Sequence, residues 1–373
     1  MQADSLQLLL AGIAHLTLGA AVMIAAGATL IYLAVVKEYE PMLLLPIGAG
    51  AILANLPLSP LVEPNGMFTI LYQMGVGNEL FPLLIFIGIG AMTDFGPLLE
   101  NPRLMLLGAA GQFGIFGTLM LALALGFTLN QAASIGIIGA IDGPTSIYVS
   151  SRLAPELLGP ITVCAYSYMS LVPLIQPPIM RWVTTRRERS IRMPYSERTI
   201  SRRTRVLFPL IVTLVVGTLV PMATPLIGML MLGNLMKESG VVERLTGASS
   251  KEIANIVTLF LGLAVGATMQ ASVFLTVSTL KILVLGILAF GLDTAAGLVF
   301  AKGLNVVSGG RFNPLLGAAG ISAFPMAARV VNRVGLEEDF ENFLLMHAMG
   351  ANTAGQVASV VAGGVLLALL GTS

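Results

Sequence analysis

Residues 136–148 read Gly-Ile-Ile-Gly-Ala-Ile-Asp-Gly-Pro-Thr-Ser-Ile-Tyr, and their single carboxylate, Asp142, lies in an otherwise almost entirely apolar run, residues 132–149. A carboxylate at membrane depth costs about 2.5 to 3.5 kcal/mol on insertion scales, so such a residue is usually functional. Gly143 and Pro144 follow it, and they loosen the helix and free carbonyl oxygens to face a ligand. An acid beside a broken helix predicts a cation or proton site; the alternative is a neutral, hydrogen-bonded acid.

The composition is that of a polytopic membrane protein. The chain is 56% hydrophobic, has a mean hydropathy of +0.89 and contains only 10% charged residues. A soluble domain would carry about 25% charged residues. At roughly 20 residues per span, the 373 residues could form up to about a dozen crossings or re-entrant segments. We therefore expect an all-α, multi-pass protein of the cell (inner) membrane.

Positive charge is concentrated in one segment. Nine of the twenty Lys and Arg residues fall between Arg181 and Arg205, with only Glu188 and Glu197 against them. The positive-inside rule predicts that this segment is a cytoplasmic loop. A basic run could also bind nucleic acid, but between two spans an orientation signal is the better interpretation, and we expect no nucleic-acid partner.

Glycine and proline interrupt many of the apolar runs, which predicts broken or re-entrant helices buried in protein or lining a cavity. We predict an N-terminal helix region at 1–40, a first membrane repeat at 41–180, the basic loop at 181–205 and a second membrane repeat at 206–373. The predicted apolar segments are 17–36, 41–59, 80–93, 104–127, 131–150, 159–180, 206–222, 225–236, 253–269, 272–291, 293–307, 313–328 and 342–370.

The two repeats are predicted from echoes on either side of the basic loop. Ile-Gly-Ala-Met-Thr at 89–93 is matched by Val-Gly-Ala-Thr-Met at 265–269, and the break after Asp142 is matched by Gly-Ile-Ser-Ala-Phe-Pro at 320–325. Paired interrupted segments in two halves are the best sequence indication of a transporter's midplane site. We therefore expect an inverted-repeat, transporter-like fold whose broken elements share one pocket.

A sodium ion in that pocket needs oxygen ligands. The candidates that offer oxygen are Asp142, Tyr168, Asn313, Ser322 and Asn352, and further polar side chains nearby in sequence are Tyr166, Gln176, Arg329, His347 and Gln356. For each Asn, Ser and Tyr the alternative role is a hydrogen bond between helices.

The other acids are expected to have simpler roles. Asp94 and Asp293 lie near predicted span ends, where helix capping is the simplest account. The acidic run of residues 337–341 is expected to be a solvated surface.

From about residue 30 to its end the sequence resembles the beta subunit of the biotin-dependent, sodium-pumping decarboxylases. Several long motifs in the same order carry the resemblance: Gly-Ala-Met-Thr-Asp-Phe-Gly-Pro-Leu-Leu (90–99), Asp-Gly-Pro-Thr (142–145), Leu-Ala-Pro-Glu-Leu-Leu-Gly (153–159), Ala-Tyr-Ser-Tyr-Met (165–169), Leu-Val-Pro-Leu-Ile-Gln-Pro-Pro-Ile-Met (171–180), Asn-Pro-Leu-Leu-Gly (313–317), Pro-Met-Ala-Ala-Arg-Val (325–330) and Asn-Phe-Leu-Leu-Met-His-Ala-Met-Gly (342–350). Ile141 departs from the family pattern, which leads us to expect a small residue before the acid.

The resemblance implies a membrane subunit that decarboxylates carboxybiotin and couples this reaction, with proton consumption, to Na+ export. It implies a biotin-carrying alpha or carrier subunit, a small membrane-anchored gamma subunit and a homo-oligomer. An oxaloacetate complex is favoured, although the carboxylic acid or acyl-CoA is selected on another chain. The residues that the resemblance ties to sodium and proton handling are Asp142, Tyr168, Asn313, Gly317, Ser322, Arg329 and Asn352.

The chemistry assigns roles to some of these residues. Loss of carbon dioxide from carboxybiotin leaves a ureido nitrogen that must be protonated, so a proton source must lie near the cation path. Asp142 could hold either a sodium ion or a proton. We expect Tyr168, with Ser322, to serve the proton step and Arg329 to bind the arriving carboxylate, although anchoring at the membrane interface is an equal alternative for this arginine.

Biotin is expected to arrive on a partner, because the chain contains no Met-Lys-Met attachment sequence. A different class of protein, a Na+-coupled secondary transporter, would explain Asp142 and the broken helices equally well.

Overall fold

The computed structural model describes residues 11–194, 200–323 and 325–371, and every regular element among them is a helix. Up to the basic segment the elements are α2 (Leu18–Val36), α3 (Pro41–Asn55), η1 (Pro60–Val62), α4 (Met67–Leu71), η2 (Tyr72–Val76), α5 (Leu80–Met92), α6 (Gly96–Glu100), η3 (Pro102–Leu104), α7 (Met105–Ala110), α8 (Phe113–Ala124), α9 (Leu129–Gly136), η4 (Ile137–Ala140), α10 (Gly143–Leu153), η5 (Pro155–Leu157), α11 (Leu158–Ser170), α12 (Val172–Val183) and α13 (Arg186–Arg189).

The second half is helical as well. Its elements are α14 (Arg202–Leu219), η6 (Pro221–Ala223), α15 (Thr224–Ser239), α16 (Glu243–Ala248), η7 (Ser249–Ile253), α17 (Ala254–Ala267), α18 (Ala271–Phe274), α19 (Val277–Val307), η8 (Pro314–Ala319), α20 (Met326–Glu338) and α21 (Leu345–Leu370). Most predicted apolar segments correspond to one helix or to a broken series of helices.

The chain is a multi-pass membrane protein. Five described helices or helix series are long and apolar enough to cross a bilayer: Leu18–Val36, Pro102–Ala124, Glu243–Ala267, Val277–Val307 and Leu345–Leu370. Two further pairs reach that length only across a sharp bend, of 104° for Pro41–Asn55 with Pro60–Val76 and of 68° for Pro155–Ser170 with Val172–Val183. These bends confirm that some of the helices are broken.

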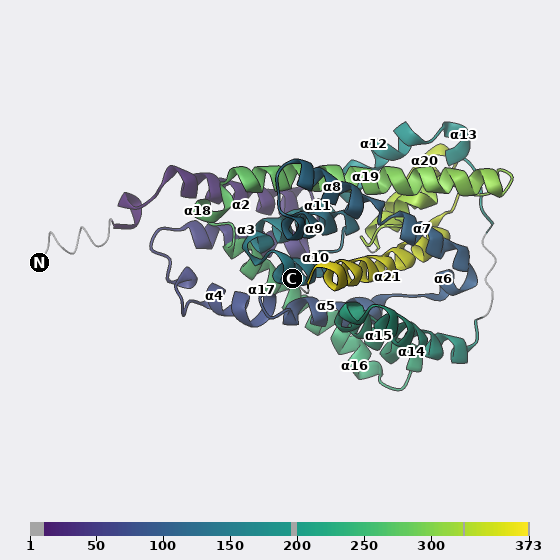
Figure 1. Ribbon diagram of the computed structural model, residues 1–373, viewed down its shortest axis with the longest axis horizontal. Helices are drawn as coiled ribbons and strands as arrows, with labels where there is room; N and C mark the ends of the chain where they lie inside the picture. The colour runs from purple at the N-terminus through teal and green to yellow at the C-terminus, as the bar shows by residue number, and fades with distance from the viewer. Residues whose placement is uncertain (1–10, 195–199, 324, 372–373) are drawn as a thin grey trace, which may run out of the picture.

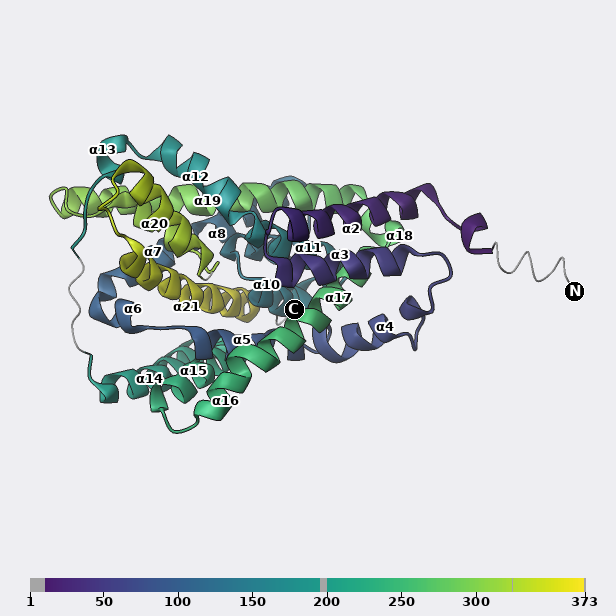
Figure 2. The same cartoon turned by 180° about the vertical axis from the view of Figure 1, so that it is seen from behind.

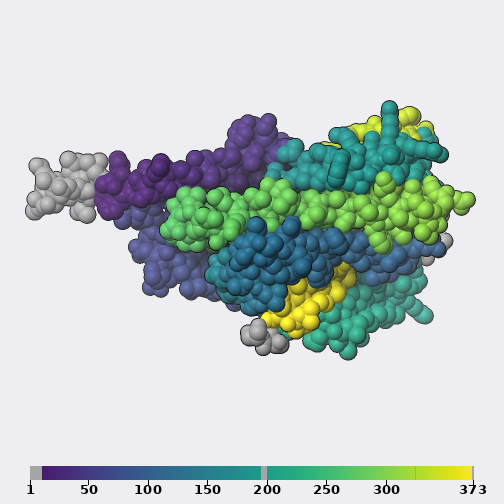
Figure 3. All heavy atoms as spheres, turned by 45° about the horizontal axis from the view of Figure 1, so that its top comes forward, coloured from purple at the N-terminus to yellow at the C-terminus, as the bar shows by residue number. Residues whose placement is uncertain are grey.

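Helix α19 runs along most of the long axis of the molecule (Figures 1 and 2) and is exposed along one face (Figure 3). Helices α14, α15 and α16 gather at one long edge, α12 and α13 lie at the opposite edge, and α21 lies between them (Figure 1). Helices α5 and α15 approach closely, because a Cβ on Gly90 would lie 1.9 Å from Leu230 O and one on Gly233 2.1 Å from Ile87 O. Small residues permit such close contact between helices.

The broken segments of the two halves touch each other. Element η4 ends at Ala140, and the carbonyl oxygen of Ala140 accepts a hydrogen bond of 3.3 Å from the Ser322 amide, which follows η8. The shared location agrees with the expectation that both halves contribute to one pocket. The inverted orientation of 41–180 relative to 206–373 stays a prediction.

The predicted break between 272–291 and 293–307 is wrong. Helix α19 continues without interruption through Asp293, whose side chain is 0% exposed. Asp293 therefore does not cap its own helix; its Oδ1 accepts a 2.5 Å hydrogen bond from Gly114 N, in the first turn of α8. A glycine costs a helix only about 1 kcal/mol, so the glycines of this segment do not end it when its faces are packed.

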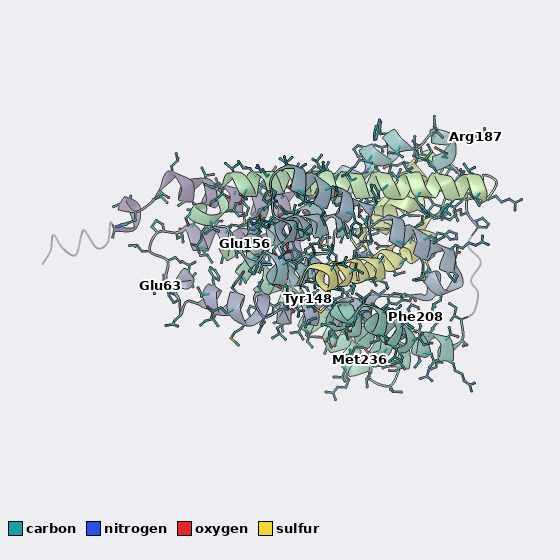
Figure 4. All side chains as sticks on the ribbon, in the orientation of Figure 1. Glu63, Tyr148, Glu156, Arg187, Phe208 and Met236 are labelled. Atoms are coloured by element: carbon teal, nitrogen blue, oxygen red, sulfur yellow. The ribbon has the colours of Figure 1, made fainter. Side chains whose placement is uncertain are left out.

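Residues 181–194, which we call the basic strap, pack against the second half. Arg189 contacts Glu338 at 2.7 Å, with side chains that are only 10% and 13% exposed. Arg181 bonds Glu337 and Arg192 bonds Asp339 in the same region, whereas Arg187 lies at the periphery on α13 (Figure 4). The expectation that residues 337–341 form a solvated run holds for Glu337, Phe340 and Glu341, which are exposed, but not for Glu338 and Asp339, whose side chains are only 13% and 17% exposed.

The strap also has a pH-sensitive pair. Hydrogen bonds from the Arg192 guanidinium hold the pKa of Asp339 below its ordinary value. The Asp339 carboxylate is therefore charged at neutral pH, and the stabilisation from this pair is lost as the pH falls through the lowered pKa.

Replacing Arg189 by Met should destabilise the protein, because it leaves the largely covered Glu338 carboxylate with only the exposed Arg186, 3.1 Å away, as a cation and removes the hydrogen bond to Thr184 O. The cost should lie below that of a buried charge left without any partner, which is about 3 to 5 kcal/mol. The unfolding temperature in detergent should fall clearly for Arg189→Met and stay near the wild-type value for Arg187→Met, an exposed arginine of the same helix. Equal unfolding temperatures for the two variants would show that the strap does not stabilise the fold.

Candidate functional site

Asp142 is the N-cap residue of helix α10. Its Oδ1 accepts a 3.1 Å hydrogen bond from Thr145 N, as an N-cap does, and Pro144 occupies the first turn, where a missing donor is tolerated. The preceding residue, Ile141, has a left-handed backbone with φ of 54°. That conformation is unfavourable for a β-branched residue, so the surrounding packing must hold it in place. The whole residue Asp142 is 5% exposed.

The second carboxyl oxygen joins the two halves of the molecule. Oδ2 of Asp142 accepts hydrogen bonds from the hydroxyl of Ser322 at 3.0 Å and from that of Ser359 at 2.7 Å. Ser322 follows η8, and Ser359 lies in α21. The structure therefore brings Asp142 and Ser322 together, as the sequence predicts.

Ser359 is a site residue that the sequence analysis missed. It lies three and seven residues after Gln356 and Asn352 in α21, and this spacing places the three side chains on one helical face. The spacing was visible in the sequence. It became informative only once one member of the face was known to contact the acid.

Tyr166, rather than Tyr168, lies beside Asp142. A Cβ on Gly143, the next residue after the acid, would lie 2.3 Å from Cζ of the Tyr166 ring, and the buried Tyr166 hydroxyl has no hydrogen-bond partner among the described residues. Tyr168 donates a 2.7 Å hydrogen bond to Leu283 O of α19. Residues two apart in a helix point about 200° apart, so the two rings face nearly opposite sides of α11.

A cavity of ≈ 240 Å³ reaches Asp142. Its buried end is polar, with Tyr166, Ser322 and Gln356 around the acid, and its walls are mostly apolar side chains of α3, α5 and α17. The exposed side chains Met42, Met92 and Asn255 mark its open side.

Glu40 also lines the cavity, just before α3 begins. Burial raises the pKa of the Glu40 carboxyl, and the nearby positive charge of Arg329 partly opposes that shift. The exposed Arg329 on α20 therefore lies near the cavity without being part of its lining.

Asn352 supports the second broken element. Its amide donates a 2.6 Å hydrogen bond to Ile321 O, beside Ser322, and its buried Oδ1 has no hydrogen-bond partner within the described ranges. Gly317 is a packing residue, because a Cβ there would lie 2.1 Å from Gly297 O of α19.

Asn313 makes its contacts elsewhere. Its Oδ1 accepts from Leu315 N at 3.0 Å, and its Nδ2 donates to Arg189 O at 3.0 Å and to Ile191 O at 2.8 Å. These bonds join the start of η8 to the basic strap. The structure thus does not bring Asn313 or Tyr168 to the carboxylate of Asp142.

The arrangement suits a monovalent hard cation. Among the described residues, no three His, Cys, Asp or Glu side chains gather as a metal cluster. One carboxylate with two serine hydroxyls, in a cavity that Gln356 also lines, provides a single negative charge and hard oxygen ligands, which suit sodium better than a transition metal.

Comparisons with known proteins identify the family of the chain. Residues 19–370 match the family described as Na+-transporting oxaloacetate decarboxylase beta subunit. The chain is 49% identical to the oxaloacetate decarboxylase beta chain of Klebsiella pneumoniae, over 95% of this chain and 96% of that one. It is 52% identical to the methylmalonyl-CoA decarboxylase subunit beta of Veillonella parvula, over 96% and 95%. These relatives fit the prediction of a decarboxylase subunit and not the alternative of a secondary transporter. The chain belongs to the family of Na+-transporting decarboxylase beta subunits.

Proposed function

We propose that this membrane subunit decarboxylates carboxybiotin delivered by a partner subunit, and that Asp142 couples this step to Na+ export by exchanging a sodium ion for a proton. The observation that carries the proposal is the position of Asp142: a buried acid that lines a cavity and is held by hydroxyls from the other half of the chain.

The hydroxyls of Ser322 and Ser359 suit both states of the acid. A serine hydroxyl can donate to a carboxylate, as here, or rotate and offer its lone pairs to a cation. The unpartnered oxygens of Tyr166 and Asn352 are further candidate ligands. A cation favours the charged form of Asp142 and desolvation favours its neutral form, so sodium and a proton compete at this carboxyl.

Tyr166, and not Tyr168 as the sequence predicts, takes the role of relaying the proton. When the C–N bond of carboxybiotin breaks, carbon dioxide leaves and the ureido nitrogen takes a proton. The Tyr166 ring packs against Gly143 beside the acid, and Tyr166 lines the cavity. Arg329, near Glu40, is our candidate for binding the arriving carboxylate.

The remaining parts of the proposal concern the complex and its orientation. Names of relatives such as "beta chain" indicate an assembly of several subunits. We propose that it contains a biotin-carrying alpha or carrier subunit, a small membrane-anchored gamma subunit and more than one copy of this chain, and that it acts on oxaloacetate. We also propose that the chain lies in the inner membrane with residues 181–205 in the cytoplasm. The arginines of the basic strap support this orientation.

The proposal is tested by measuring carbon dioxide release and sodium uptake together, with the chain and its partners in tight inverted vesicles. Omitting sodium should stop both activities, because the proton reaches the ureido nitrogen only along the path that sodium vacates. Raising the pH should slow both by limiting the proton. Full release of carbon dioxide without sodium would contradict a shared site.

Asp142→Asn should abolish sodium uptake while leaving the protein inserted, because Asn keeps the size and a hydrogen-bond acceptor but cannot exchange a proton for a cation. Asp94→Asn is the matched control, since Asp94 accepts from Gly96 N and lies in the loop before α6. Uptake near the wild-type rate in Asp142→Asn would remove Asp142 from the mechanism.

Substitutions of the two tyrosines should have clearly different effects on the rate of carbon dioxide release. Tyr166→Phe should lower the rate of carbon dioxide release about 100-fold at saturating sodium, the loss expected for a general acid. Tyr168→Phe should lose about 1 kcal/mol of stability with its bond to Leu283 O and keep most of the activity. The reverse order of rates would restore the relay role to Tyr168.

Ser359→Ala should raise the sodium concentration that gives half-maximal uptake by about tenfold or more, because a hydrogen bond to a charged group contributes roughly 1.5 to 3 kcal/mol. Ser170→Ala is a suitable control, since this serine donates to the Ser167 carbonyl of its own helix. The same half-maximal concentration in both variants would exclude Ser359 from the site.

A further inference from the structure

Asp293 is a second buried carboxyl, and the proposed chemistry leaves it without a role. It lies in the middle of α19 and is 0% exposed. One oxygen, Oδ1, accepts a 2.5 Å hydrogen bond from Gly114 N, and Oδ2 has no hydrogen-bond partner in the described part of the chain. Burying a polar group costs free energy unless it is hydrogen-bonded, so the bond to Gly114 offsets part of the cost of burying Asp293.

The bond caps a helix in another part of the sequence. Gly114 lies in the first turn of α8, where amide groups lack partners within the helix. The residue in the N-cap position, Gln112, makes no side-chain cap bond. The Asp293 carboxyl supplies the missing acceptor, and its polarity suits the positive end of the α8 dipole.

The capped end of α8 supports the element that leads to Asp142. A Cβ on Gly139 of η4 would lie 2.8 Å from the carbonyl carbon of Gly114, and one on Gly136 would lie 2.7 Å from Ile115 O. Element η4 thus rests directly on the first turn of α8. Asp142 follows η4 after one residue.

The same stretch of α19 supports the second broken element. Gly297, one turn after Asp293, packs against Gly317 of η8, and a Cβ on Gly297 would lie 2.3 Å from Gly317 O. Ser322 follows η8 and donates to Asp142. Both elements that carry the site therefore rest on α19 or on the helix end that Asp293 caps.

We propose that Asp293 is a positioning residue for the cation site: as a hydrogen-bond acceptor it holds α8 against α19, and α8 in turn fixes η4 and the Asp142 carboxyl. This inference rests on the proposed cation site at Asp142. The role needs an acceptor oxygen and not a titrating group, so asparagine should replace the aspartate and leucine should not.

The test compares Asp293→Asn with Asp293→Leu in the reconstituted complex. The leucine variant should raise the half-maximal sodium concentration about tenfold, which corresponds to about 1.4 kcal/mol, with turnover at saturating sodium largely retained. The asparagine variant should stay near the wild-type value. Amide hydrogen exchange of residues 136–146 should become faster in the leucine variant and not in the asparagine variant.

A second pair of variants tests the contact between Asp293 and Gly114 by changes in α8. This pair replaces the first test if the leucine variant fails to fold. Gly114→Ala places a methyl 2.5 Å from Asp293 Oδ1 and 2.8 Å from Ala289 O, so it should separate the helices and raise the sodium requirement. Gly117→Ala in the same helix has room for the methyl, 3.5 Å from Leu292 Cδ1, and should behave as wild type.

Three outcomes would overturn the inference. An equal rise in the half-maximal sodium concentration in Asp293→Asn and Asp293→Leu would show that the proton of Asp293 matters and not its acceptor oxygen. Unchanged exchange and an unchanged sodium requirement in both Asp293→Leu and Gly114→Ala would show that the contact is dispensable. Faster exchange with an unchanged sodium requirement would refute the cation site at Asp142 while leaving the contact between Asp293 and α8 intact.

Discussion

The hydrogen bonds between Asp142 and two serines are the constraint on which the rest of the structure depends. A carboxyl in apolar surroundings must be bonded, and here the side-chain donors, Ser322 and Ser359, come from the second half of the chain. Neither half can form the site alone. The contact between the broken elements at Ala140 and Ser322 and the bond from Asn352 to Ile321 hold those donors in place.

Irregular backbone in a membrane protein is stable only where other protein groups bond it. Several breaks in this structure have such a partner from a distant part of the sequence. Asp293 caps α8, and Asn313 binds both the start of η8 and the carbonyl oxygens of the basic strap. Asn313, which the resemblance ties to sodium and proton handling, thus shapes the start of the second broken element and does not contact Asp142.

The end of the molecule that carries the basic strap is held by ion pairs. By the positive-inside rule the arginines of residues 181–194 predict a cytoplasmic loop, and in the structure they bind the acids of residues 337–341. The pair between Arg189 and Glu338 is almost excluded from water, so it joins α13 to α20 more firmly than an exposed pair could. The strap therefore connects the end of the first half to the helix that follows the second broken element.

The sequence by itself determined the membrane class and predicted broken elements and a site at Asp142, because composition, glycine and proline positions and a lone charge in an apolar run are local properties. Motifs spread over the chain also identified the family. Only the tertiary structure decided that Tyr166 faces the acid, that Ser359 completes its hydrogen bonds and that Asp293 caps α8. The physical reason is that these contacts depend on the rotation of each helix about its axis and on which helix lies next to it, and residues far apart in the sequence set both.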